Sequence, residues 1–180
     1  MDLTKALQKI ADVFEKEEVS YMIVGGFATS YYNRYRFTSD IDCVVGMYPH
    51  NIEKIVKHFP DWMSFLPAFK ENAERGIVFN LTDFDTGVKY DFMLYQDSDY
   101  SWTAFERRKK VTFSGIDCYI ATAEDLIISK LQWYNVSESG KQLEDIQFLL
   151  KLKNIDFQYL KLWTSKLYIK THGLLGKRKS

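Results

Sequence analysis

Residues 24–28 (Val-Gly-Gly-Phe-Ala) and residues 36–42 (Arg-Phe-Thr-Ser-Asp-Ile-Asp) carry the pattern that decides the fold. The glycine pair follows an apolar run over residues 20–24, which predicts a strand that enters a tight turn. Residues 27–33 are expected to continue as a short helix. Glycine lets a phosphate approach the backbone, and a helix start offers free N–H groups. A glycine pair alone is more often only a turn, so its weight comes from its place before the aspartates.

The second stretch opens a strand that carries two carboxylates on one face. Residues 38–45 alternate, so Asp40 and Asp42 point to one side while Ile41 and Cys43 point to the other. Neighbouring carboxylates repel unless a cation neutralises them, and Mg²⁺ prefers such oxygen ligands together with substrate phosphates. For this pair alone, a polar strand face in water is the alternative.

Asp91 is the candidate third carboxylate. It lies in the middle of a predicted strand between Tyr90 and Phe92, where an aspartate is unfavourable unless it has a function. If its strand neighbours the first one, three carboxylates converge. Together with two metal ions, such a set is typical of phosphoryl or nucleotidyl transfer. Asp97 and Asp99 are the contrast, because they are expected in a solvated polar loop.

The rest of the chain predicts an α/β (α+β) fold with a mixed sheet. The sheet would carry the aspartates on its open face, helices would cover the other face, and a C-terminal helical region would follow. Apolar periodicity, prolines and turn residues predict the following elements: helices over residues 2–18, from Pro49 to Pro60, and over 122–134, 141–152 and 156–168; hairpins over 75–95 and 109–120.

Length and composition indicate one domain, or one domain with a small helical appendage, in a reducing compartment. The chain has 180 residues, a net charge of zero, and two cysteines, Cys43 and Cys118, in alternating apolar stretches. Zero net charge excludes a body that coats nucleic acid by charge alone. The cysteines fit buried thiols in a reducing compartment. The sequence shows neither a signal peptide nor an apolar run of membrane-span length, so a cytoplasmic location with no membrane partner is expected.

The two opening stretches resemble the signature of the polymerase-beta-like nucleotidyltransferase superfamily: a hydrophobic residue, Gly-Gly, a spacer, then Asp-x-Asp. Within it the chain looks most like the bacterial group related to AbiEii abortive-infection toxins, in which Arg-x-Thr-x-Asp-Ile-Asp is typical. Residues 124–131 and 141–146 are also similar to that group, and the likeness extends over roughly residues 18–150. It implies a nucleotidyltransferase core over residues 1–121, a packed helical region over 122–170 and a basic tail over 171–180.

The resemblance also implies roles for single residues. Asp40 and Asp42 would ligate Mg²⁺. The site would hold two such ions, or Mn²⁺ in their place. Asp91 would complete the metal site and accept the proton of the attacking hydroxyl. The residues that would contact the nucleotide are Gly25, Gly26, Arg36, Thr38 and Lys130. Lys141 and Asp145 would line the cleft from the helical region, together with Lys130.

Three of these residues have a structural alternative. Lys130 lies in a helical apolar stripe, where a lysine can extend its charge into solvent. Lys141 and Asp145 are four residues apart, which fits a surface ion pair on a helix.

The implied function is transfer of an NMP from an NTP to a hydroxyl acceptor, with release of pyrophosphate. tRNA, a protein or a small molecule could be the acceptor, and a toxin role would add an antitoxin partner. A catalytically silent nucleotide-binding module is the first alternative. The second is an RNA-binding adaptor that uses the basic stretches at residues 107–110 and 177–179.

Overall fold

The structure is a computed structural model, and it describes residues 2–32 and 38–176. The chain forms two compact units. The first contains Met1–Ala28 and Arg36–Ala121, and the second contains Thr29–Tyr35 and Thr122–Ser180. Each unit has its own secondary structure.

The first unit is built on a mixed six-stranded sheet in the order β3-β4-β2-β1-β6-β5. The hairpins β3–β4 and β5–β6 and the pair β1–β2 are antiparallel, whereas β2–β4 and β1–β6 are parallel. The expected mixed sheet and both hairpins are confirmed. The strands are β1 (Ser20–Val24), β2 (Asp40–Gly46), β3 (Phe79–Asp83), β4 (Val88–Leu94), β5 (Lys109–Phe113) and β6 (Ile116–Ile120).

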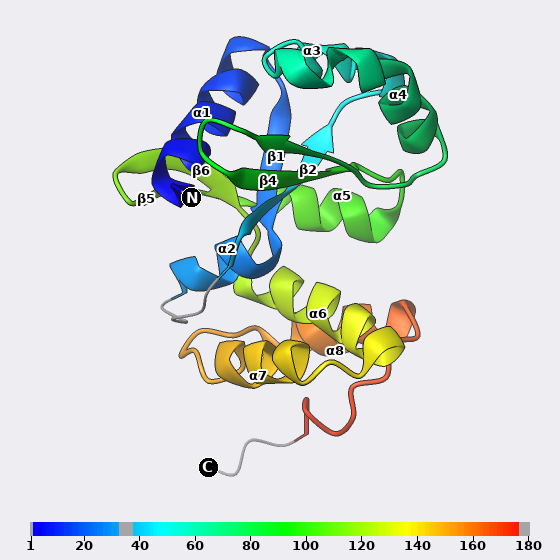
Figure 1. The fold of residues 1–180 in the computed structure, drawn as a ribbon. Helices are drawn as coiled ribbons and strands as arrows, with labels where there is room; N and C mark the ends of the chain where they lie inside the picture. Colours follow the sequence, from blue (N-terminus) through cyan, green and yellow to red (C-terminus); the bar gives the residue numbers. More distant parts are fainter. Residues whose placement is uncertain (1, 33–37, 177–180) are drawn as a thin grey trace. The chain divides into compact units, whose positions relative to one another are not determined.

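Helices cover one face of this sheet, as expected: α1, α3 and α4 lie over it (Figure 1). Their bounds, with the other helical segments of the first unit, are α1 (Leu3–Lys16), α2 (Gly25–Tyr31, which runs on into the second unit), η1 (Pro49–Asn51), α3 (Glu53–Val56), η2 (Pro60–Phe65), α4 (Leu66–Glu74) and α5 (Asp99–Glu106).

Aromatic side chains fill the space between the sheet and these helices. Phe92 stacks on Phe79 and meets Phe14 of α1 edge-on, with ring centroids 5.0 and 6.3 Å apart. Tyr90 is fully buried, and its hydroxyl donates to the Ala6 carbonyl at 2.9 Å. The high aromatic content therefore builds the core of this unit, because such rings bury large areas with fixed geometry.

Two helices were missed by the sequence analysis. α4 begins with Pro67 in its first turn, a position that tolerates proline, but its apolar pattern is weak. α5 begins at Asp99, so the prediction that Asp99 lies in a polar loop is wrong. The Ser98 hydroxyl caps α5 by accepting from the Ser101 N–H, and such capping residues are also typical of loops.

The second unit contains α6 (Ala123–Ser137), α7 (Gly140–Leu149) and α8 (Phe157–Lys166), which match the three expected C-terminal helices. Its interior is unusually polar. The Thr122 hydroxyl caps α6 and also donates to Asp125, which accepts a second hydrogen bond from Tyr159 of α8. Of the helices formed by the described residues, none combines the length and hydropathy that crossing a bilayer requires.

Asp145 does not form the surface ion pair that its spacing from Lys141 suggested. It is fully buried, and its carboxylate lies 2.8 Å from the ammonium of Lys130, itself buried between α6 and α7. The alternative that Lys130 extends into solvent is therefore wrong too. A buried charge pair of this kind is costly to break, because either partner alone would be left unneutralised.

We expect Tyr90→Phe to lower the free energy of unfolding by about 1 kcal/mol, because it removes one buried hydrogen bond and keeps the ring. Chemical denaturation measures this loss. Tyr168→Phe is the control, since Tyr168 is 93% exposed and should cost nothing. Equal stabilities of Tyr90→Phe and the wild type would show that the bond to Ala6 does not stabilise the core.

Candidate active site

The parallel pairing of β2 and β4 brings the three predicted aspartates together. Asp42 pairs with Asp91, and Asp40 pairs with Lys89. Paired residues on neighbouring strands point to the same face, and the strands are about 4.8 Å apart. Asp40, Asp42 and Asp91, which we call the carboxylate cluster, therefore lie side by side on the face opposite the aromatic core.

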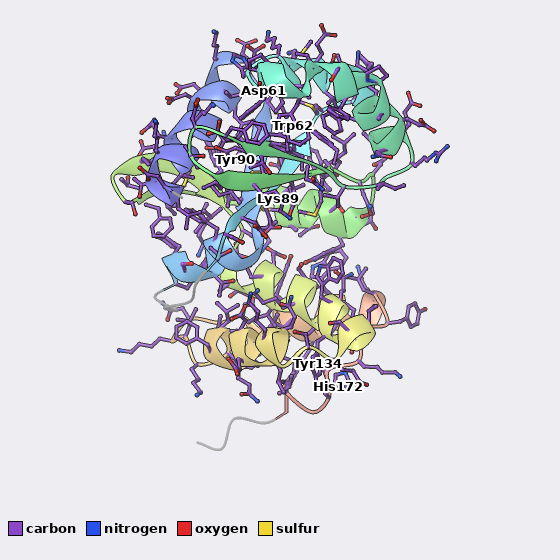
Figure 2. The ribbon with its side chains drawn as sticks, in the orientation of Figure 1. Asp61, Trp62, Lys89, Tyr90, Tyr134 and His172 are labelled. Carbon is purple, nitrogen blue, oxygen red and sulfur yellow. The ribbon has the colours of Figure 1, made fainter. Side chains whose placement is uncertain are left out.

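The aromatic core fixes this register. Residues of β4 alternate, with Tyr90 and Phe92 buried and Lys89 and Asp91 partly exposed on the other side. Figure 2 labels Lys89 and Tyr90, which leave β4 in opposite directions. A slip of one residue would bury the charges and expose the rings, so the packing of the rings holds Asp91 opposite Asp42.

Gly25 lies directly against Asp42. Its φ is +64°, and a Cβ at this position would lie 2.0 Å from Asp42 Oδ2. No other residue type fits there without moving the carboxylate. The Gly26 N–H, at the start of α2, donates to Asp42. The glycine pair was predicted to hold phosphates. That role stays a prediction, and the structure adds that the pair shapes the space around Asp42.

Asp42 has an unfavourable environment for its charge. Burial raises its pKa above the ordinary value of 3.8, and repulsion from Asp91 and Asp40 raises it further. Attraction to Lys89 and the Gly26 N–H oppose this but do not cancel it. The described residues around the cluster thus leave part of its negative charge unneutralised, which favours a bound cation.

Lys89 is a site residue that the sequence analysis missed. Its ammonium lies 2.8 Å from Asp91 Oδ2 and 3.7 Å from Asp40 Oδ2. The hydrogen bond to Asp91 raises the pKa of Lys89. The signal was present in the sequence, because a lysine two residues before an aspartate on one strand shares its face. A charged lysine has no acceptor atom for a metal ion, so a pattern of metal-ligating residues does not include it.

The remaining predicted residues lie in different places. The Thr38 hydroxyl donates to the Asp40 carbonyl at 3.3 Å, at the start of β2. Arg36 lies outside the described residues. Lys130 belongs to the second unit, where it pairs with Asp145, and its predicted contact with the nucleotide stays a prediction.

The donor set fits a hard divalent cation such as Mg²⁺, because it consists of carboxylate oxygens with uncompensated charge. Within residues 2–32 and 38–176, no group of three or more acidic, histidine or cysteine side chains is closed around a common point. The contacts explain this: Asp40 and Asp91 turn toward Lys89, and Asp42 turns toward the Gly26 N–H.

A family of nucleotidyltransferases of unknown function, DUF6036, matches residues 1–171. The chain belongs to this family. The prediction of a nucleotidyltransferase is thereby confirmed at the level of the family. No curated protein matches the chain in sequence.

Solved structures similar to this DUF6036 protein show the same fold. One is the antigenic nucleotidyltransferase-like protein from Paracoccidioides brasiliensis, at 16% identity and a TM-score of 0.56, covering 98% of this chain and 94% of that one. Another is the antibiotic-resistance factor ANT(2'')-Ia, at 13% identity and a TM-score of 0.59, covering 93% of each chain. A third is the lincosamide antibiotic adenylyltransferase LnuA, at 13% identity and a TM-score of 0.50, covering 83% of this chain and 97% of that one. The predicted nucleotidyltransferase fold is confirmed.

Gly25→Ala should destabilise this DUF6036 protein by more than the backbone strain alone would explain. A left-handed backbone costs a non-glycine residue about 1–2 kcal/mol, and here the new methyl also collides with Asp42. Gly76→Ala is a matched control, since Gly76 has a φ of +69° with nothing within 4 Å of a Cβ. Thermal unfolding compares the two variants. Equal losses would mean that the close approach to Asp42 has no energetic weight.

Asp42→Asn should stabilise the metal-free protein at neutral pH. A raised pKa means that the folded state binds the proton more tightly than the unfolded chain. The contribution of Asp42 to stability is thus fully present below its ordinary pKa and is lost as the pH rises through the raised pKa.

The advantage of Asp42→Asn in EDTA should therefore be clear at pH 7 and disappear near pH 3. Urea unfolding across this range measures it, with Asp117→Asn on β6 as an exposed control. A variant that is less stable than the wild type by the same amount at every pH would contradict this reading of the cluster.

Proposed function

We propose that this DUF6036 protein is a divalent-metal-dependent enzyme that transfers an NMP from an NTP to the hydroxyl of a small molecule. The observation that carries the proposal is the register of β2 and β4, which sets Asp42 beside Asp91 and Asp40 one position along the same face. Asp40, Asp42 and Asp91 would hold the cation. When bound, Mg²⁺ neutralises the triphosphate and lowers the pKa of an attacking hydroxyl.

The protein residues have distinct parts in this reaction. The backbone of Gly25 and Gly26 binds the β- and γ-phosphates at the turn, and Arg36 and Thr38 also contact the triphosphate. The acceptor oxygen forms a bond to the α-phosphorus while the bond from that phosphorus to the pyrophosphate oxygen breaks. The hydroxyl proton passes to the Asp91 carboxylate, and pyrophosphate leaves.

Two facts support a small-molecule acceptor. The net charge of zero gives no general attraction for RNA. Two proteins with this fold are associated with small molecules: LnuA is a lincosamide antibiotic adenylyltransferase, and ANT(2'')-Ia was solved in complex with adenylyl-2''-tobramycin, at 14% identity and a TM-score of 0.54.

A toxin-like transferase that modifies tRNA or a protein, with an antitoxin partner, is the second candidate. The likeness of residues 36–42 to the AbiEii group favours it. In the described basic stretch, two of the charges contact the protein itself: the Arg108 guanidinium packs 4.2 Å from the Phe105 ring centre, and Lys110 lies 3.8 Å from Asp117. The other basic stretch, residues 177–179, lies outside the described residues.

Asp42→Asn and Asp91→Asn should each reduce transfer at least a hundredfold, because each removes a proposed metal ligand. The assay incubates purified protein with Mg²⁺ or Mn²⁺, each α-labelled NTP in turn, and a pool of hydroxylated small molecules, bulk tRNA or lysate protein.

Asp117→Asn is the control and should keep full activity. Label on the small-molecule fraction, lost in both site variants, supports the proposal, and label on tRNA or protein selects the second candidate. If the protein binds NTP with a metal, transfers nothing to any acceptor and binds equally well as Asp91→Asn, it is instead a catalytically silent nucleotide-binding module.

A further inference from the structure

Lys89 is the cation that the carboxylate cluster holds in this structure. Its ammonium contacts Oδ2 of both Asp91 and Asp40, at 2.8 and 3.7 Å. The sheet register explains both contacts, since Lys89 is paired with Asp40 and lies two residues before Asp91 on the same face. The side chain therefore runs along the cluster and bridges two strands.

One ammonium cannot neutralise three carboxylates. Among the described residues, one ammonium against three carboxylates leaves a formal charge of −2. Asp42 has no ion-pair contact with Lys89 and is attracted by it only at longer range. A divalent cation would supply the missing charge. It would bind the same carboxylates that Lys89 contacts, and two cations held at the same carboxylates would repel strongly.

Lys89 is also able to leave. Its side chain is 39% exposed, whereas that of Asp91 is 17% exposed. A flexible four-carbon stem lets the ammonium move into water while the carboxylates stay fixed on their strands.

We propose that Lys89 is a positioning residue, which holds Asp91 and Asp40 together while no metal is bound and which a divalent cation displaces from them. The inference rests on the proposed function, because it takes the carboxylate cluster as the metal site. Lys89 thus sets the threshold concentration at which the metal enters, and with it the difference in stability between the metal-free and metal-bound protein.

The experiment compares Lys89→Met with the wild type in EDTA and in saturating Mn²⁺. Methionine keeps the length of the side chain and removes the charge. In EDTA the variant should unfold at a temperature several degrees lower, because the carboxylates lose their counter-ion. In Mn²⁺ this gap should close, and the Mn²⁺ dissociation constant, measured by electron paramagnetic resonance, should fall about five- to tenfold. A purely structural role would give the same gap in both conditions.

Two further variants make the result specific. Lys70→Met removes a lysine that is similarly exposed and lies 3.5 Å from Glu53, so it should leave Mn²⁺ affinity unchanged. Lys89→Arg keeps the charge and should restore the stability in EDTA.

The outcomes separate this inference from the proposed function. If the wild type binds Mn²⁺ and Asp42→Asn abolishes that binding, the metal site stands. An unchanged Mn²⁺ affinity in Lys89→Met then overturns the role of Lys89 alone. If the wild type binds no Mn²⁺, the proposed function and the displacement fail together. The counter-ion role is then decided in EDTA by a double-mutant cycle between Lys89→Met and Asp91→Asn, where zero coupling overturns it.

Discussion

The repulsion among Asp40, Asp42 and Asp91 is the constraint on which the rest of the site depends. Three carboxylates on two adjacent strands destabilise a fold unless their charge is neutralised, and burial of Asp42 strengthens the effect. Within the part of the chain that the structure describes, the Lys89 ammonium is the one cation that contacts the cluster, and a single positive charge does not neutralise three carboxylates. A site that keeps this excess of negative charge is suited to gain free energy from a divalent cation.

The surrounding structure holds the carboxylates where this repulsion is greatest. The rings of Tyr90 and Phe92, which contact α1, prevent a shift of β4 that would separate Asp91 from Asp42. On the other side of Asp42, Gly25 has no side chain, so the Asp42 carboxylate can lie against the turn into α2. The core and the turn thus hold the three carboxylates close together at a cost in stability. Such strain is typical of functional sites.

Much of this could be predicted from local pattern. The alternation around Asp42 and the charge within the strand of Asp91 gave the correct faces, because a strand has a period of two whatever surrounds it. Their adjacency followed from no local rule and came from the family resemblance. Lys89 was overlooked although its position obeys the same period. Its role depends on which strand lies alongside, and one strand's pattern does not contain that information.

The errors have the same origin. Asp145 has the spacing of a surface pair, yet it is buried against Lys130, since helix spacing does not reveal which face is covered by other helices. α5 was missed because Ser98 and Asp99 are equally suited to a cap and to a loop. The sequence pattern therefore predicted well which face of a strand each side chain occupies, and poorly which residue that side chain contacts.

A crystal structure with Mn²⁺ and a non-hydrolysable NTP tests the central claim most directly, because anomalous scattering locates the metal without assumption. We expect anomalous peaks at about 2.0–2.2 Å from oxygens of Asp40, Asp42 and Asp91, with the triphosphate at the Gly25–Gly26 turn and the Lys89 ammonium displaced. A triphosphate bound with its metal away from these carboxylates, or Lys89 still bonded to Asp91 beside a bound nucleotide, would contradict it.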